Sequence, residues 1–171
     1  MKAETETQPI RVIIADDHPV IREGLAAIFR SQNDIKVVAE AVDGEEACQL
    51  YDQLSPDVLL LDLRMPKKGA LQAVIELMSR ARAPKPRIIV MATYEEEEDI
   101  HRTLSAGARG YILKAAAPEY IRQAVRRAAR EKASFPALGE HRYEGASSVV
   151  GQMEGEPVTG HAMVELVGDW N

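Results

Sequence analysis

The stretch VIIADDHPVIREGL at residues 12–25 joins a short apolar run, two adjacent acids and the start of a helical pattern. Its first residues are apolar on both faces, as in a strand buried within a parallel sheet. Asp16 and Asp17 close this run abruptly. The two acids are therefore expected either at a water-facing strand end or in one half of a metal site whose other half lies elsewhere in the chain.

Four further apolar runs have the same character, and helical periodicity follows each run. The five runs cover residues 11–15, 36–41, 57–62, 87–92 and 110–114. Pro118 is expected at the start of the last helix. Because parallel strands need right-handed crossovers, the sequence predicts a flavodoxin-like, doubly wound α/β fold. We expect a five-stranded parallel sheet of order 2-1-3-4-5 with five helices.

Length and composition narrow the class of protein. The 171 residues fit one domain with extensions, and the single cysteine, Cys48, excludes an internal disulfide. A reducing, cytoplasmic location is the expectation. No apolar run approaches the roughly 20 residues of a membrane span. Most of the net charge of −6 lies in residues 133–171, and neither half of the chain has the basic surface that binds nucleic acid.

Polar residues follow the predicted strands at their carboxyl ends. Asp16 and Asp17 follow the first strand, Asp62 ends the third and Lys114 ends the fifth. In a parallel sheet these ends lie at one edge, where ligands bind. Converging carboxylates persist only beside a cation or with a raised pKa. We expect Mg²⁺ or Mn²⁺ there, beside a carboxylate that takes a phosphoryl group.

Each of these residues also has a purely structural interpretation. Asp16 or Asp17 would cap the first helix, Asp62 would be an ordinary acid at a strand end, and Lys114 would be a surface lysine. Their joint placement on one sheet edge favours the site. His18 has no metal-ligand companion among the three other histidines, so zinc is not expected.

Three stretches, IIADDHPVIREGL, DVLLLDLRMP and AGARGYILK, resemble the receiver domains of two-component response regulators. The form ADDHP…REGL resembles the LuxR-type (NarL/FixJ-like) branch. The resemblance covers residues 10–132 and implies that Asp62 accepts a phosphoryl group from a sensor histidine kinase. Such a self-modifying switch is not a turnover enzyme.

The resemblance also implies a metal site, a switch and a contact face. The metal ligands would be Asp16, Asp17, Asp62 and the backbone carbonyl of Arg64. Lys114 would pair with the phosphorylated Asp62, and Tyr111 would turn inward on phosphorylation. A homodimer would form through the fourth helix, the fifth strand and the fifth helix.

Two stretches depart from the family pattern. Ala92 occupies the slot of a Thr or Ser that hydrogen-bonds the phosphoryl group, and Thr93 lies one place later. Because adjacent strand residues face opposite sides, Thr93 substitutes only if the strand has already ended. Lys67 and Lys68 stand where the family has small or apolar residues.

We also have expectations for the two ends of the chain and consider two alternative functions. Residues 1–9 are expected to be a disordered extension, and residues 133–171 an acidic, Gly-rich tail that is poorly structured or forms short strands. No helix-turn-helix pattern is found there. One alternative is a LuxR-type transcriptional regulator whose DNA-binding domain is truncated or replaced. Another is a Mg-dependent phosphohydrolase of the haloacid-dehalogenase type, which is disfavoured because Arg64 stands where that family has its second acid.

Overall fold

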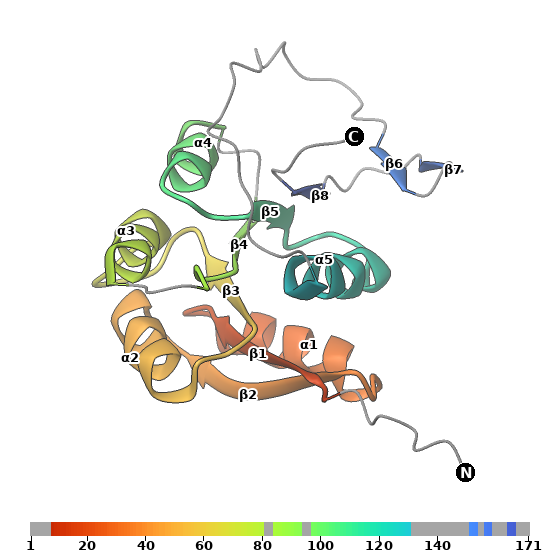
Figure 1. Cartoon of the computed structure of the whole chain (residues 1–171), viewed down its shortest axis with the longest axis horizontal. Helices are drawn as coiled ribbons and strands as arrows, with labels where there is room; N and C mark the ends of the chain where they lie inside the picture. The colour runs from red at the N-terminus through yellow and green to blue at the C-terminus, as the bar shows by residue number, and fades with distance from the viewer. Residues whose placement is uncertain are drawn as a thin grey trace.

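The computed structural model describes residues 8–80, 84–93 and 97–130, together with three short strands beyond them. Strands and helices alternate along the chain (Figure 1), as the sequence predicts. The elements are β1 (Ile10–Ala15), α1 (Pro19–Arg30), β2 (Ile35–Ala41), α2 (Gly44–Leu54), β3 (Val58–Asp62), α3 (Ala70–Arg80), β4 (Ile88–Ala92), α4 (Glu97–Ser105), β5 (Gly110–Leu113) and α5 (Pro118–Arg130).

The five strands β1 to β5 pair in parallel in the order β2-β1-β3-β4-β5, which confirms the predicted flavodoxin-like topology. A further strand, β8 (Val164–Leu166), pairs antiparallel with β5 and makes the sheet six-stranded. β6 (Gly151–Met153) and β7 (Glu156–Val158) form a separate antiparallel pair. Short strands thus occur within residues 133–171, while residues 1–7 and the rest of that tail lie outside the described residues.

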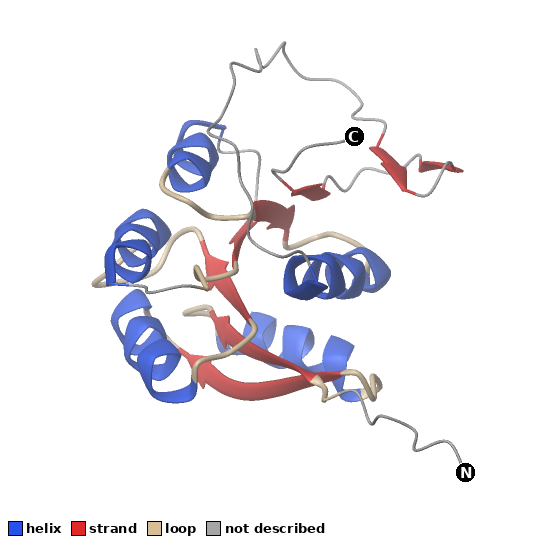
Figure 2. Cartoon of the chain, in the orientation of Figure 1, coloured by secondary structure: helices blue, strands red, loops and turns tan. Residues whose placement is uncertain are grey.

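Helices cover both faces of the sheet (Figure 2). α1 and α5 pack on one face and α2, α3 and α4 on the other, around two buried clusters of mostly aliphatic side chains. β3 and β4 are buried along their whole length, which explains their unbroken apolar sequences. None of the helices in the described ranges is both long and apolar enough to span a bilayer.

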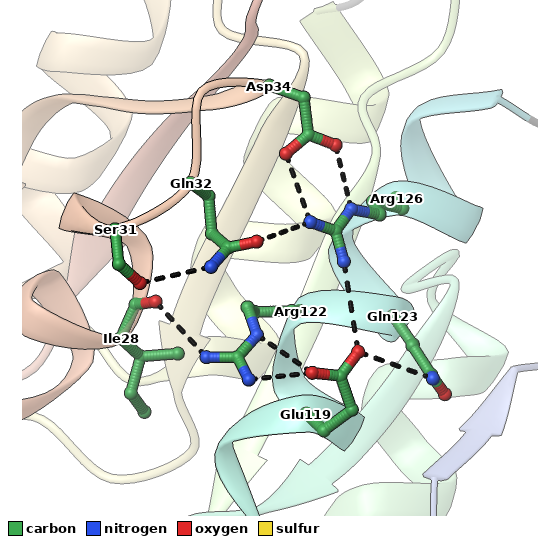
Figure 3. A network of polar contacts seen from close by, with 8 residues as sticks. All are labelled: Ile28, Ser31, Gln32, Asp34, Glu119, Arg122, Gln123 and Arg126. Carbon is green, nitrogen blue, oxygen red and sulfur yellow. Dashed lines mark hydrogen bonds and ion pairs between the residues drawn. The ribbon is translucent and has the colours of Figure 1, made fainter.

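A polar network joins α5 to the end of α1 (Figure 3). Arg126 donates to both carboxylate oxygens of Asp34 at 2.7 and 3.0 Å, and to the side chain of Gln32 at 2.7 Å. Arg122 donates to Glu119 and to the backbone carbonyl of Ile28. The hydrogen bonds from Arg126 hold the pKa of Asp34 below its usual value.

The loop after β3 packs tightly against the start of α2. A Cβ atom at Gly44 would lie 2.2 Å from the backbone oxygen of Lys68, so only glycine fits there. Lys67 lies in the left-handed region at φ 62°, and its ammonium contacts Asp43 at 2.7 Å. Lys68 pairs with Glu76 on α3. The two unusual lysines thus join the loop to the flanking helices.

Candidate functional site

The strand ends bring the predicted acids together. Ala15 lies opposite Leu61 in the β1–β3 register. The residues that follow these two, Asp16 and Asp62, are therefore neighbours. Backbone hydrogen bonds continue the ladders past the strands, from Asp16 to Ala41 at 3.1 Å and from Lys114 to Ala92 at 2.8 Å. These hydrogen bonds hold the backbone of Asp16 and Lys114 in place at the carboxyl edge of the sheet, which we call the rim.

Lys114 bridges two carboxylates at this rim. Its Nζ lies 2.6 Å from Asp16 Oδ2 and 2.8 Å from Asp62 Oδ2. The Asp16 side chain is fully buried, and those of Asp62 and Lys114 are only 5% and 9% exposed. One ammonium thus compensates part of the charge of two buried acids.

Burial and charge set the protonation of this group. Burial raises the pKa of Asp62, and the negative charge of Asp16 adds to the rise against the opposing hydrogen bond from Lys114. Burial also disfavours the Lys114 ammonium, but hydrogen bonds to the two carboxylates outweigh it and raise the pKa of Lys114. A further cation at the rim would favour ionised Asp62.

Three of the four predicted metal ligands, Asp16, Asp17 and Asp62, meet at one place. Ligand atoms of Asp16, Asp17, His18 and Asp62 all lie within 4.8 Å of one another. Asp16 Oδ2 and Asp17 Oδ1 are shielded from solvent, and each faces one nitrogen: Lys114 Nζ lies 2.6 Å from the first and His18 Nδ1 2.9 Å from the second. Carboxylate oxygens gathered in this way fit a hard divalent cation such as Mg²⁺.

Arg64 lies beside this cluster on the loop after β3. Its backbone amide is 3.4 Å from Asp62 Oδ1, while its exposed side chain lies 3.7 Å from Asp99 on α4. The part of its carbonyl in metal binding stays a prediction. Because Arg64 occupies the place of the second acid of a haloacid-dehalogenase phosphohydrolase, the site lacks that acid.

His18 is the site residue that the sequence interpretation missed. Its ring Nδ1 lies 2.9 Å from Asp17 Oδ1 and 3.3 Å from Asp16 Oδ1. Its companions are acids rather than other histidines, so the search for histidine pairs could not find them. His18 rather than Asp16 or Asp17 is the N-cap residue of α1, and it makes no side-chain capping bond. The adjacency of His18 to two acids and to Pro19 was the available signal.

The three candidate switch residues, Ala92, Thr93 and Tyr111, differ in how deeply they are buried. Ala92 is the last residue of β4 and is 1% exposed, whereas Thr93 follows in an exposed bend. Among the described residues no hydrogen bond joins Thr93 to Asp62. Tyr111 is 3% exposed and packs in the same buried cluster as Ala92. Its ring thus lies inside the protein in this structure.

The sequence profile described as the response regulator receiver domain matches residues 12–126. The chain belongs to this family. The receiver is 40% identical over 126 residues to the uncharacterized transcriptional regulatory protein YxjL of Bacillus subtilis, covering 74% of this chain and 57% of that protein. It is 38% identical over 122 residues to the nitrate/nitrite response regulator protein NarL of Escherichia coli K12, covering 71% and 56%.

A solved structure agrees with this assignment. The two-component response regulator of the LuxR family from Aurantimonas sp. matches the receiver with a TM-score of 0.66 and 30% identity, over 71% of this chain and 86% of that one. The predicted LuxR-type branch is thereby confirmed. The chain spans little more than half the length of YxjL and NarL, and the matches cover the receiver alone. Receiver domains of response regulators are signalling switches.

Proposed function

We propose that Asp62 is the phosphoacceptor of this receiver and takes its phosphoryl group from a sensor histidine kinase in the cytoplasm. A carboxylate oxygen of Asp62 attacks phosphorus, the bond from phosphorus to the donor breaks, and the donor leaves with the electron pair. The product is an acyl phosphate. The observation that carries the proposal is the Lys114 ammonium between Asp62 and Asp16.

Lys114 and the acidic cluster divide the electrostatic work. The Lys114 ammonium offsets charge on the transferring phosphoryl group from one side. Asp16, Asp17, Asp62 and the backbone carbonyl of Arg64 would hold Mg²⁺ or Mn²⁺ on the other. The bound ion would neutralise part of the negative charge on the phosphoryl oxygens. The chain acts as a switch that modifies itself rather than as a turnover enzyme.

Intact mass spectrometry tests the acceptor directly. We expect acetyl phosphate with Mg²⁺ to add one phosphoryl mass to the native chain and none to Asp62→Asn. Asp52→Asn, which changes an exposed acid on α2, should be modified like the native chain, and a chelator should abolish the modification. An unmodified native chain, or equal modification of Asp62→Asn, would exclude Asp62 as the acceptor.

The proposed receiver unit covers residues 10–132, and a second copy is its proposed partner after phosphorylation. The contact face would be formed by α4, β5 and α5. β8 runs along the free edge of β5 in this structure, so a partner must pack beside β8 or displace it. Light scattering of the phosphorylated and unphosphorylated chain tests this step, and an unchanged monomer would contradict it.

A further inference from the structure

The acidic rim contains a nitrogen ligand that phosphoryl transfer does not use. His18 Nδ1 lies 2.9 Å from Asp17 Oδ1 and 3.3 Å from Asp16 Oδ1. Ligand atoms that share one ion at about 2.0 to 2.2 Å lie roughly 3 Å apart. The nitrogen and the two oxygens already have the spacing of a common coordination shell.

The backbone brings the imidazole to this position. His18 precedes Pro19, and its φ of −93° and ψ of 111° are the extended values that a following proline favours. Its amide donates to Asp16 Oδ1 at 2.8 Å, which holds this carboxylate close to His18. Because the His18 side chain is 66% exposed, an ion from solvent can reach Nδ1.

The ring faces two carboxylate oxygens with a single nitrogen. Nδ1 lies 3.3 Å from Asp16 Oδ1 and 2.9 Å from Asp17 Oδ1, and it carries at most one proton for both oxygens. Carboxylate oxygens that share one donor are incompletely satisfied. A cation shared by Asp17 Oδ1 and His18 Nδ1 would satisfy both atoms.

We propose that His18 is a metal ligand that lets this site bind Zn²⁺ in competition with Mg²⁺. Mg²⁺ selects oxygen ligands, whereas an imidazole nitrogen favours Zn²⁺ and its neighbours in the transition series. Asp17 and His18 form the pair of ligands, and Asp16 and Asp62 complete the set. This inference rests on the proposed function in one respect: Zn²⁺ held by Asp62 withholds that carboxylate from phosphoryl transfer.

Competition with a chromophoric chelator measures Zn²⁺ binding without phosphorylation. We expect His18→Gln to weaken the tightest Zn²⁺ site by at least about 10-fold, since even outer-shell partners of metal ligands contribute that much. Mg²⁺ affinity should stay within about twofold, because Mg²⁺ uses only oxygen ligands. His101→Gln removes an exposed imidazole on α4 and should leave both affinities unchanged.

Thermal unfolding verifies that both variants fold. The Zn²⁺ affinities then decide whether His18 is a ligand. Equal Zn²⁺ affinity in the native chain and His18→Gln would overturn the proposal. So would equal losses in His18→Gln and His101→Gln.

Phosphorylation gives an independent second measurement. Zn²⁺ added to acetyl phosphate and Mg²⁺ should lower the phosphorylated fraction of the native chain, and His18→Gln should need about 10-fold more Zn²⁺ for the same loss. If the native chain is never phosphorylated but the chelator assay separates the two histidine variants, the Zn²⁺ site stands and the proposed function fails. Equal inhibition of both proteins would contradict the role of His18.

Discussion

At the scale of one residue, the buried position of Asp62 lowers the stability of the folded chain. Its side chain is 5% exposed and lies beside the fully buried Asp16, with Lys114 as the shared counter-ion. Burial, together with the charge of Asp16, raises the pKa of Asp62. A carboxyl whose pKa is higher in the folded chain favours folding while protonated, and this contribution is lost as the pH rises through the folded pKa.

Asp62→Asn should therefore stabilise the metal-free receiver at pH 7, by about 0.5 to 2 kcal/mol, as relief of a strained functional site commonly does. The gain should shrink as the pH falls through the folded pKa of Asp62 and the native carboxyl becomes protonated. Urea unfolding from pH 7 downward, with a chelator present, measures this change. Mg²⁺ should stabilise the native chain more than the variant. A loss of stability at pH 7 would contradict this reasoning.

Tyr111 and Ala92 form a second feature at this scale. The Tyr111 ring is buried, and the methyl side chain of Ala92 offers no hydroxyl to a phosphoryl group. Residue 92 therefore offers no hydroxyl through which a phosphoryl group on Asp62 could act on Tyr111.

Beryllium fluoride with Mg²⁺, used as a phosphate analogue, should shift NMR signals around Asp62 but leave those of the Tyr111 ring nearly unchanged. Ala92→Ser should make the ring signals respond, since it adds only a hydroxyl. Ala92→Thr should do the same but cost about 1 to 3 kcal/mol through overpacking. A full response of Tyr111 in the native chain would show that the two residues are already coupled.

At the scale of elements, the start of α2 and the loop after β3 act as one unit. The Lys68 carbonyl passes so close to Gly44 that no side chain fits between them, and Lys67 contacts Asp43 across the same gap. The loop that carries Arg64 is therefore positioned by α2 as well as by β3.

Two glycine substitutions test this unit against a matched control. Gly44→Ala should destabilise the receiver by about 1 to 3 kcal/mol, because its Cβ would lie 2.2 Å from the Lys68 oxygen. Gly24→Ala on α1 meets nothing within 4 Å and should stabilise by about 0.5 to 1 kcal/mol. Urea denaturation separates the two. Similar changes in stability in both variants would mean that the loop after β3 moves to make room for the added Cβ atom.

The elements themselves were predictable from the sequence. Buried parallel strands are apolar on both faces, so the runs that end in Ala15, Asp62 and Ala92 marked β1, β3 and β4 to within one residue. The meeting of Asp16, Asp62 and Lys114 followed, because parallel strands end at one edge.

Contacts that depend on side-chain direction were not predictable. The ring of His18 reaches the acids through an extended pre-proline backbone, and the pair of Lys67 and Asp43 spans 24 residues of chain. The pairing of β8 with β5 was also missed, since a three-residue strand in the sequence carries no mark of its partner.

At the scale of the whole molecule, the chain is acidic. The net charge is −6. Two of the basic side chains of α5, Arg122 and Arg126, are paired with Glu119 and Asp34. We therefore expect this chain by itself to attract duplex DNA only weakly.

A gel shift should accordingly show no complex between this chain and duplex DNA at about 0.15 M salt, because DNA binding depends on release of counterions by basic groups. A titration from low to moderate salt controls for weak attraction. A complex that persists at moderate salt would mean that a DNA-binding surface exists in this chain.

The ladder bonds that run past the strands have one more consequence. The amides of Asp16, Leu63 and Lys114 donate to Ala41, Met91 and Ala92, so the backbone at the rim is tied into the sheet. Such amides exchange their hydrogens only when the sheet itself opens. In deuterium exchange the rim should thus be as slow as the core, and a signal that leaves the site must travel through side chains and loops rather than through a moving rim.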